Sequence, residues 1–201
     1  MNRGLDMARG KYVGILESDD FMAPDALEKL VAAAERFDAD FAKANFDLYW
    51  SKPEERRELM ELFKAKDCGK PVHPSATVDT FSLKPSIWSA VYRRDFLNRN
   101  AIRFLPTPGA AFQDASFTFK VFALADTAVY LHDSVLSYRQ DNEALRSIRP
   151  IKFIALMMSM PRFIAGLLRI MPRRTLRWTL PSCLGLQISL NTIRICGATF
   201  A

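Results

Sequence analysis

Short apolar runs alternate with amphipathic segments along the first 140 residues, and the two patterns predict different elements. The runs rich in β-branched and aromatic residues, each predicted to be a strand, are 11–16, 41–46, 87–92, 127–131 and 135–139. Apolar residues recur at helical spacing in 26–37 and, after Gln113-Asp114, in 117–124, which predicts two helices. Because strands and helices alternate, the fold class predicted is α/β.

Three weaker patterns complete this outline. Residues 2–8 read as the end of a helix that stops at Arg9-Gly10. Pro24 is expected at the first position of the next helix. The charged segment 51–70 predicts a surface excursion with a helix near Glu54–Phe63.

The first predicted strand runs directly into an acidic turn, Glu17-Ser18-Asp19-Asp20. The strand is continuously apolar, which is typical of an inner strand of a parallel sheet. Ligands of open α/β sheets bind beyond the carboxyl ends of such strands. Clustered carboxylates repel one another, and a divalent cation relieves that repulsion. Two interpretations are open at this point: a site for a metal and a phosphate, or a solvated turn that caps the following helix.

Composition narrows the class of protein. The chain has 201 residues, 49% of them hydrophobic, which suits one domain with an appended tail. The formal net charge is +6, but the excess of Arg lies after residue 145, so a nucleic-acid partner is not expected. The three cysteines are far apart and form neither a zinc motif nor a disulfide framework. The sequence has no pattern of a signal peptide or of a membrane-spanning helix.

The order of several motifs, more than any one of them, indicates a family. Asn2–Tyr12, Glu17–Asp20 and Pro24 follow one another as an N-x-G helix, a G-x-Y strand and a D-S-D-D-like turn. Leu105–Asp114 and Tyr138–Asn142 are similar to a later loop with an acidic pair and to a closing Y-R segment. Together these segments resemble the inverting glycosyltransferases of family 2, in particular those of capsular or other cell-surface polysaccharide synthesis.

The resemblance implies a partial GT-A fold, a Rossmann-like sheet with flanking helices that binds a nucleotide-sugar, over residues 1–143. It implies that Asp19, helped by Glu17, holds a divalent metal (Mn²⁺ or Mg²⁺) on the donor diphosphate, with Asp20 beside them in the substrate site. Asp114 is implied to be the base that deprotonates the acceptor. The expected partners are a UDP-linked sugar and a glycan or lipid-linked acceptor, and the expected location is the cytoplasm, at the inner face of the cell membrane.

Three further residues are candidates for substrate binding. Gln113 stands where the family has Glu, so it can form hydrogen bonds but carries no charge. Trp88 either packs in the core or stacks on the acceptor. Arg139 either binds the diphosphate through two hydrogen bonds or pairs with a neighbouring carboxylate. Asp114 is also expected to be a helix N-cap, a role compatible with catalysis.

The two ends of the chain depart from the family pattern. The family's first strand and nucleotide-base loop are expected upstream of Met1, so this chain alone is expected to bind nucleotide-sugar poorly. Residues 144–201 have many Arg and no acid. They predict either basic amphipathic helices on an anionic membrane or a tail translated out of frame. The alternative function is thus an inactive fragment that only associates with membranes. A magnesium phosphatase that uses the same acidic turn is a weaker option.

Overall fold

The computed structural model describes residues 1–76, 78–106, 113–142, 187–189, 192–195 and 198–200. The chain divides into two units, Met1–Leu156 and Met157–Ala201. In the second unit, β8 (Gln187–Ser189), β9 (Thr192–Ile195) and β10 (Ala198–Phe200) form an antiparallel sheet with β9 in the centre. The amphipathic helices predicted for the tail lie outside the described residues. Within the described part of the chain, no helix has the length and apolar character needed to cross a membrane.

The elements of the first unit are, in chain order, α1 (Asn2–Met7), β1 (Tyr12–Gly14), β2 (Phe21–Met22), α2 (Ala26–Arg36), β3 (Phe41–Trp50), β4 (Arg56–Met60), η1 (Ala65–Asp67), β5 (Pro71–Val72), η2 (Pro74–Ala76), η3 (Val78–Ser82), β6 (Ala90–Arg93), α3 (Arg94–Arg99), α4 (Gln113–Leu124) and β7 (Ala128–Arg139).

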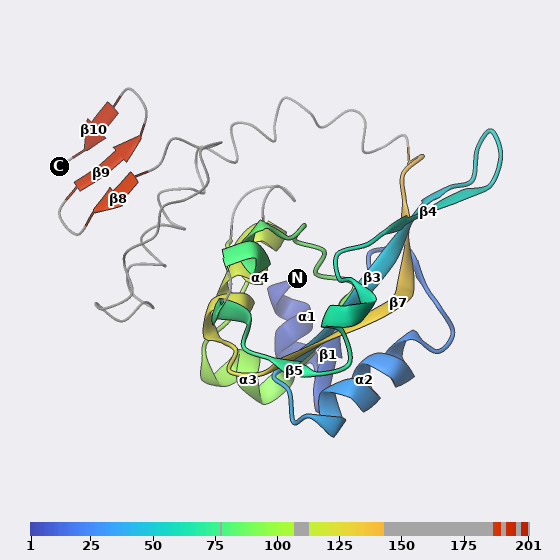
Figure 1. Cartoon of the computed structure of the whole chain (residues 1–201), viewed down its shortest axis with the longest axis horizontal. Helices are drawn as coiled ribbons and strands as arrows, with labels where there is room; N and C mark the ends of the chain where they lie inside the picture. Colours follow the sequence, from blue (N-terminus) through green and yellow to red (C-terminus); the bar gives the residue numbers. More distant parts are fainter. Residues whose placement is uncertain (77, 107–112, 143–186, 190–191, 196–197, 201) are drawn as a thin grey trace. The chain divides into compact units, whose positions relative to one another are not determined.

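These strands form one mixed sheet in the order β1-β6-β3-β7-β2, with β4 added to β3 and β5 added to β7. The two long strands, β3 and β7, are parallel neighbours at its centre, and the other pairs are antiparallel. Figure 1 shows β3 and β7 side by side. Helix α2 packs against β3, β6 and β7. The predicted α/β class, a sheet with flanking helices, is confirmed.

The first strand differs from its prediction. β1 covers only Tyr12–Gly14 and pairs with β6 in the antiparallel direction, at one end of the sheet order. The prediction of an inner parallel strand at residues 11–16 is therefore wrong. Val13 and Ile15 are buried whereas Gly14 and Leu16 are exposed, so only alternate positions face the core. The run is continuously apolar because Leu16, although it is exposed, is also apolar.

Three other local predictions also need correction. The helix expected near Glu54–Phe63 is the strand β4, which pairs with the second half of β3. The two strands expected at 127–131 and 135–139 are one strand, β7, whose pairing with β3 shifts register in the middle. Helix α2 begins at Ala26 with Asp25 as its N-cap residue, so Pro24 precedes the helix.

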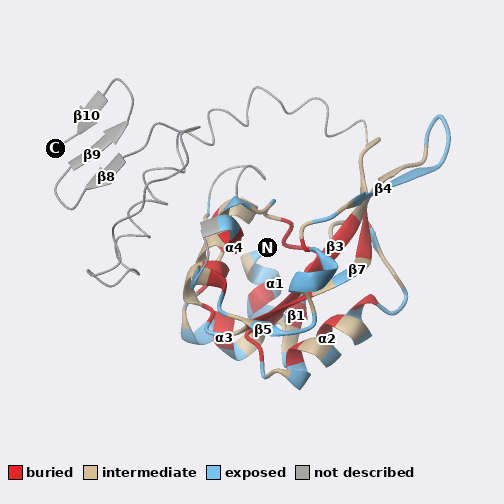
Figure 2. Cartoon of the chain, in the orientation of Figure 1, coloured by how far each residue is buried: buried red, intermediate tan, exposed pale blue. Residues whose placement is uncertain are grey.

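The core lies where β3 and β7 meet the helices, and Figure 2 shows these strands as largely buried. Phe41 has no exposed surface, and its ring lies 5.6 Å from that of Phe122 on α4 and 6.3 Å from that of Tyr92 on β6. Leu30 and Ala34 on α2 are likewise fully buried. Burial of large apolar side chains from distant segments is the main favourable contribution to this fold.

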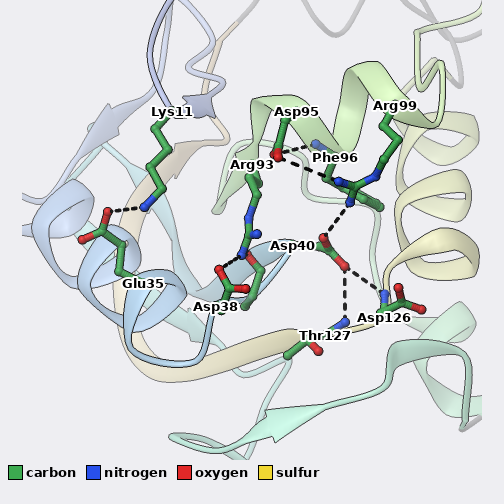
Figure 3. A network of polar contacts seen from close by, with 11 residues as sticks. Lys11, Glu35, Asp38, Asp40, Arg93, Asp95, Phe96, Arg99, Asp126 and Thr127 are labelled. Atoms are coloured by element: carbon green, nitrogen blue, oxygen red, sulfur yellow. Dashed lines mark hydrogen bonds and ion pairs between the residues drawn. The ribbon is translucent and has the colours of Figure 1, made fainter.

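A carboxylate at the start of β3 connects three segments of the chain (Figure 3). Asp40 Oδ2 accepts hydrogen bonds from the backbone N–H groups of Asp126 at 2.9 Å and Thr127 at 3.3 Å. Its Oδ1 lies 3.7 Å from the guanidinium of Arg99 on α3. Asp40 is only 7% exposed, so these partners satisfy a buried charge and fix the start of β7 beside β3.

Candidate active site

The acidic turn lies between β1 and β2 and is held against the end of β7. The turn closes on itself through a 3.3 Å hydrogen bond from Asp20 N to Glu17 O. β2 follows at once and pairs with β7, where Phe21 lies opposite Ser137. The carboxylates therefore sit next to Tyr138 and Arg139, residues that lie about 120 positions further along the chain.

Asp20 is the most buried member of the turn, with 8% exposure. Its Oδ1 accepts a 2.9 Å hydrogen bond from the backbone N–H of Arg139. Its Oδ2 is buried without a hydrogen-bond partner among the described residues. Burial raises the pKa of the Asp20 carboxyl to about 6. The charges of Asp19 and Glu17 act in the same direction, and the Arg139 hydrogen bond opposes them.

Asp19 is held by Arg139, the last residue of β7, and by Asn142 in the segment that follows. Asn142 Nδ2 donates a 2.8 Å hydrogen bond to Asp19 Oδ2, and Arg139 Nε donates a 3.2 Å hydrogen bond to the Asp19 carbonyl. These contacts fix one carboxylate oxygen and the backbone of the turn. No hydrogen bond to Asp19 Oδ1 occurs within the described residues.

The same closing segment is fastened to the end of β3. Asp141 Oδ2 accepts hydrogen bonds from Ser51 N at 2.7 Å and Ser51 Oγ at 2.6 Å. Hydrogen bonds from Ser51 and from the Lys52 backbone keep the pKa of Asp141 at about 2, despite some desolvation. Arg139 Nη1 lies 3.0 Å from Ser51 Oγ and 3.4 Å from Asp141 Oδ1. Arg139 is thus paired with a carboxylate, one of the two roles that the sequence left open, and its contact with a diphosphate stays a prediction.

Asp114 lies in the first turn of α4, as the second residue of that helix. Its Oδ1 accepts a 2.8 Å hydrogen bond from the N–H of Ala115. The helix starts at Gln113, so the prediction that Asp114 is the N-cap residue is wrong. Gln113 and Asp114 are both partly exposed. The loop that precedes them, 107–112, lies outside the described residues.

Tyr138 lies next to Arg139 at the end of β7. Burial raises the pKa of its phenol, and the negative charges of Asp20, Asp19, Asp114 and Glu17 raise it further. The assignment of Asp19 and Glu17 to a metal and of Asp114 to the base stays a prediction.

Trp88 is a buried neighbour of Tyr138, with 7% exposure. Its indole stacks on the Tyr138 ring at 4.7 Å and 24°, and it meets the Phe46 ring edge-on at 4.4 Å. The packing role, one of the two that the sequence left open, is the one these contacts support. Direct contact with an acceptor stays a prediction.

Sequence reasoning missed several residues that order the site. Ser51, Asp141 and Asn142 form the contacts that fasten the closing segment, yet their sequence signal is only their proximity to the Y-R segment. Among the described residues, no three His, Cys, Asp or Glu side chains form a cluster able to hold a metal by themselves.

Comparison with known proteins identifies the family. Residues 1–122, more than half of the chain, match the family model described as Glycosyl transferase family 2. This chain belongs to glycosyl transferase family 2. Its family 2 relatives include the uncharacterized glycosyltransferase YibD of Escherichia coli K12, which is 27% identical over 212 residues. That alignment covers 98% of this chain and 58% of YibD.

A second family 2 relative is the uncharacterized glycosyltransferase EpsJ of Bacillus subtilis 168, 24% identical over 73% of this chain and 43% of EpsJ. The chain thus spans about half the length of these relatives. The YibD alignment extends well beyond residue 143, so it lends no support to a tail translated out of frame.

Solved structures show the same fold. S. aureus TarS 1–349 in complex with UDP-GlcNAc superposes with a TM-score of 0.54 at 21% identity, over 73% of this chain and 40% of TarS. The TarS complex with UDP gives a TM-score of 0.53 at 19% identity, over 78% of this chain and 44% of TarS. The predicted GT-A architecture is therefore confirmed for this family 2 domain.

Proposed function

We propose that this chain transfers a sugar from a nucleotide-sugar donor, UDP-linked, to a hydroxyl of a glycan or lipid-linked acceptor, with inversion at the anomeric carbon. The observation that carries the proposal is the acidic turn held at the end of β7, where Arg139 and Asn142 form hydrogen bonds to Asp19 and Asp20. A single displacement needs a base on one side of the anomeric carbon and stabilisation of the leaving group on the other. Family membership and the UDP and UDP-GlcNAc complexes of TarS support this donor class.

Asp114 is the base in this proposal. Its carboxylate takes the proton of the acceptor hydroxyl as the oxygen bonds to the anomeric carbon, and the bond from that carbon to the diphosphate breaks with its electron pair on the diphosphate. Asp114 lies in the first turn of α4, where the positive end of the helix dipole favours an acidic side chain. Gln113 beside it is proposed to donate a hydrogen bond to the substrate.

Asp19 and Glu17 are proposed to hold a divalent cation, Mn²⁺ or Mg²⁺. The residues fit such an ion because Mg²⁺ in phosphate-transfer sites takes one or two carboxylates and completes its shell with substrate phosphates and water. The buried, unpaired Oδ2 of Asp20 shows a surplus of hard oxygen atoms here. When bound, the cation supplies neutralisation of the leaving diphosphate. Asn142 and Arg139 hold the turn so that Asp19 keeps an oxygen for this purpose.

The biological setting is proposed on the resemblance alone. Synthesis of a capsular or other cell-surface polysaccharide, at the cytoplasmic face of the membrane, fits a nucleotide-sugar donor and a lipid-linked acceptor. The basic tail at 144–201 is proposed to add a peripheral contact with anionic lipids.

The test is donor turnover with and without acceptor in the presence of Mn²⁺. Asp114→Asn should lower kcat by about 10²- to 10⁴-fold, the usual contribution of a general base, with little change in donor KM. Asp133→Asn is the matched control, because Asp133 is an exposed acid paired with Lys29 on α2 and should leave kcat unchanged. Full kcat in Asp114→Asn would remove this residue from the reaction.

A further inference from the structure

Lys43 is a buried lysine in the middle of the sheet, and the proposed reaction does not use it. It lies on β3, where its neighbours across the strands are Ala90 on β6 and Tyr130 on β7. The whole residue is 2% exposed (Figure 2 shows this part of β3 as buried). A lysine at such a position is unusual because lysine side chains are almost never fully buried unless paired.

The Lys43 ammonium is held by one short turn. Its Nζ donates to Ser86 Oγ at 2.8 Å, to Ser89 Oγ at 3.0 Å and to the carbonyl of Ser86. Three donors thus meet three acceptors, and both serines are fully buried. No carboxylate of the described part of the chain pairs with this group, and burial lowers the pKa of Lys43 to about 7.

The fold does not need Lys43 to satisfy that turn. Ser89 Oγ also donates to Ser86 O at 3.2 Å, and the two hydroxyls lie 3.1 Å apart. The backbone of the turn is joined to β3 independently, through a 2.9 Å hydrogen bond from Ala44 N to Ser89 O. Burying a charged group without an opposite charge costs free energy, so an apolar side chain of similar volume should be at least as stable at this position. Stability alone therefore does not account for a lysine here.

The turn carries Trp88 between the two residues that Lys43 holds. The Trp88 indole stacks on Tyr138, and Arg139, the next residue of β7, forms hydrogen bonds to Asp19 and Asp20 of the acidic turn. A continuous series of contacts therefore runs from the Lys43 ammonium through Ser86 and Ser89 to Trp88 and on to the centre of the site. Small displacements of catalytic groups are costly, since a misplacement of about 1 Å can lower a rate about 10²-fold.

We propose that Lys43 is a positioning residue for sugar transfer. By holding the turn of Ser86 and Ser89 to the centre of the sheet, it sets Trp88 and, through Trp88, the Tyr138 ring beside the catalytic carboxylates. This inference rests on the proposed function. It predicts that removal of the ammonium disturbs catalysis while the protein stays as stable as before.

The first experiment is Lys43→Met, which keeps a long unbranched side chain and removes the charge. The midpoint of thermal unfolding should be unchanged or higher. The kcat for each folded molecule should fall about tenfold or more, with donor KM changed by less than about threefold, because Lys43 does not touch the donor. Lys120→Met is the matched control. Lys120 is half-buried on α4, and its hydrogen bond within the described residues goes to the Arg103 carbonyl, so kcat should stay at the wild-type value.

The second experiment needs no enzymatic activity. In a Trp50→Phe, Trp178→Phe background, Trp88 is the single indole, and Lys43→Met should increase its quenching by acrylamide. Ser89→Ala should give the same change if the contact runs through the turn. When Ser89→Ala is added to Lys43→Met, kcat should fall little further, since the two substitutions remove the same interaction.

Two results would overturn the inference. In the first, Lys43→Met lowers the unfolding midpoint and leaves kcat for each folded molecule intact. That result would mean that Lys43 has a purely structural role. In the second, neither kcat nor Trp88 quenching changes. If the wild-type chain transfers no sugar under any condition, the proposed function fails, and the quenching of Trp88 still decides whether Lys43 sets its position.

Discussion

Asp20 gives a quantitative prediction about the pH dependence of stability. Its pKa lies at about 6 in the folded protein against an ordinary value of 3.8, because the carboxyl is buried and flanked by other acids. The folded state therefore binds a proton at Asp20 more tightly than the unfolded state does. The free energy of unfolding should fall as pH rises from about 4 to about 6, where Asp20 ionises in the fold at a cost.

The magnitude follows from the shift in the Asp20 pKa. A shift of about two units corresponds to about 3 kcal/mol at 1.36 kcal/mol per unit. Nearby water at this turn screens part of the effect, which leaves about 1–2 kcal/mol. Asp20→Asn cannot ionise, so it should gain this amount over the wild type between pH 4 and pH 7, whatever constant offset the substitution adds.

The assay is urea unfolding of both proteins across that pH range, at constant ionic strength and with a chelator present. Asp141→Asn is the matched control, because the pKa of Asp141 is lowered to about 2 rather than raised. The difference in free energy of unfolding between Asp141→Asn and the wild type should not change with pH above pH 5. The stability that the wild type gains from ionised Asp141 should be lost only as pH falls through the acid range. A flat difference for Asp20→Asn between pH 4 and 7 would refute the burial argument for this carboxyl.

Three further predictions concern binding and stability. Asn142→Ala should weaken Mn²⁺ binding by about tenfold, because the amide no longer orients Asp19. Electron paramagnetic resonance measures this affinity, and an unchanged value would show that Asn142 does not help to bind the cation. Asp40→Ala should lower the free energy of unfolding by about 2–4 kcal/mol, since two backbone N–H groups lose their acceptor, whereas a loss below that range would mean that water replaces the carboxylate. Leu30→Ala should cost about 2–5 kcal/mol because Leu30 is fully buried. Leu27→Ala, on the exposed side of the same helix, should cost no more than about 0.5 kcal/mol, and equal losses at the two positions would contradict the placement of α2.

Helices were the most predictable part of this fold, because their apolar spacing is a local property. Helix α4 contains the apolar positions 117–124 that predicted it, although it begins earlier than expected, at Gln113. Strand β4 was not predictable in this way: Arg56, Arg57 and Glu58 are all exposed, so no buried face leaves a pattern, and the strand exists because β3 extends far enough to pair with it. The interruption expected in β7 is an exposed stretch, 132–133, where the register with β3 shifts.

The sequence by itself determined the order of the motifs: an apolar run followed by Glu17–Asp20, a helix that starts near Asp114, and a closing Tyr138-Arg139. That order was enough for the family, since each motif depends on residue types at short spacing. Only the tertiary structure decided that Arg139 and Asn142 hold the acidic turn, and that Lys43 is buried. Local pattern sets the type of an element, but the partners of its side chains depend on long-range strand pairing and packing, which short spacing does not encode.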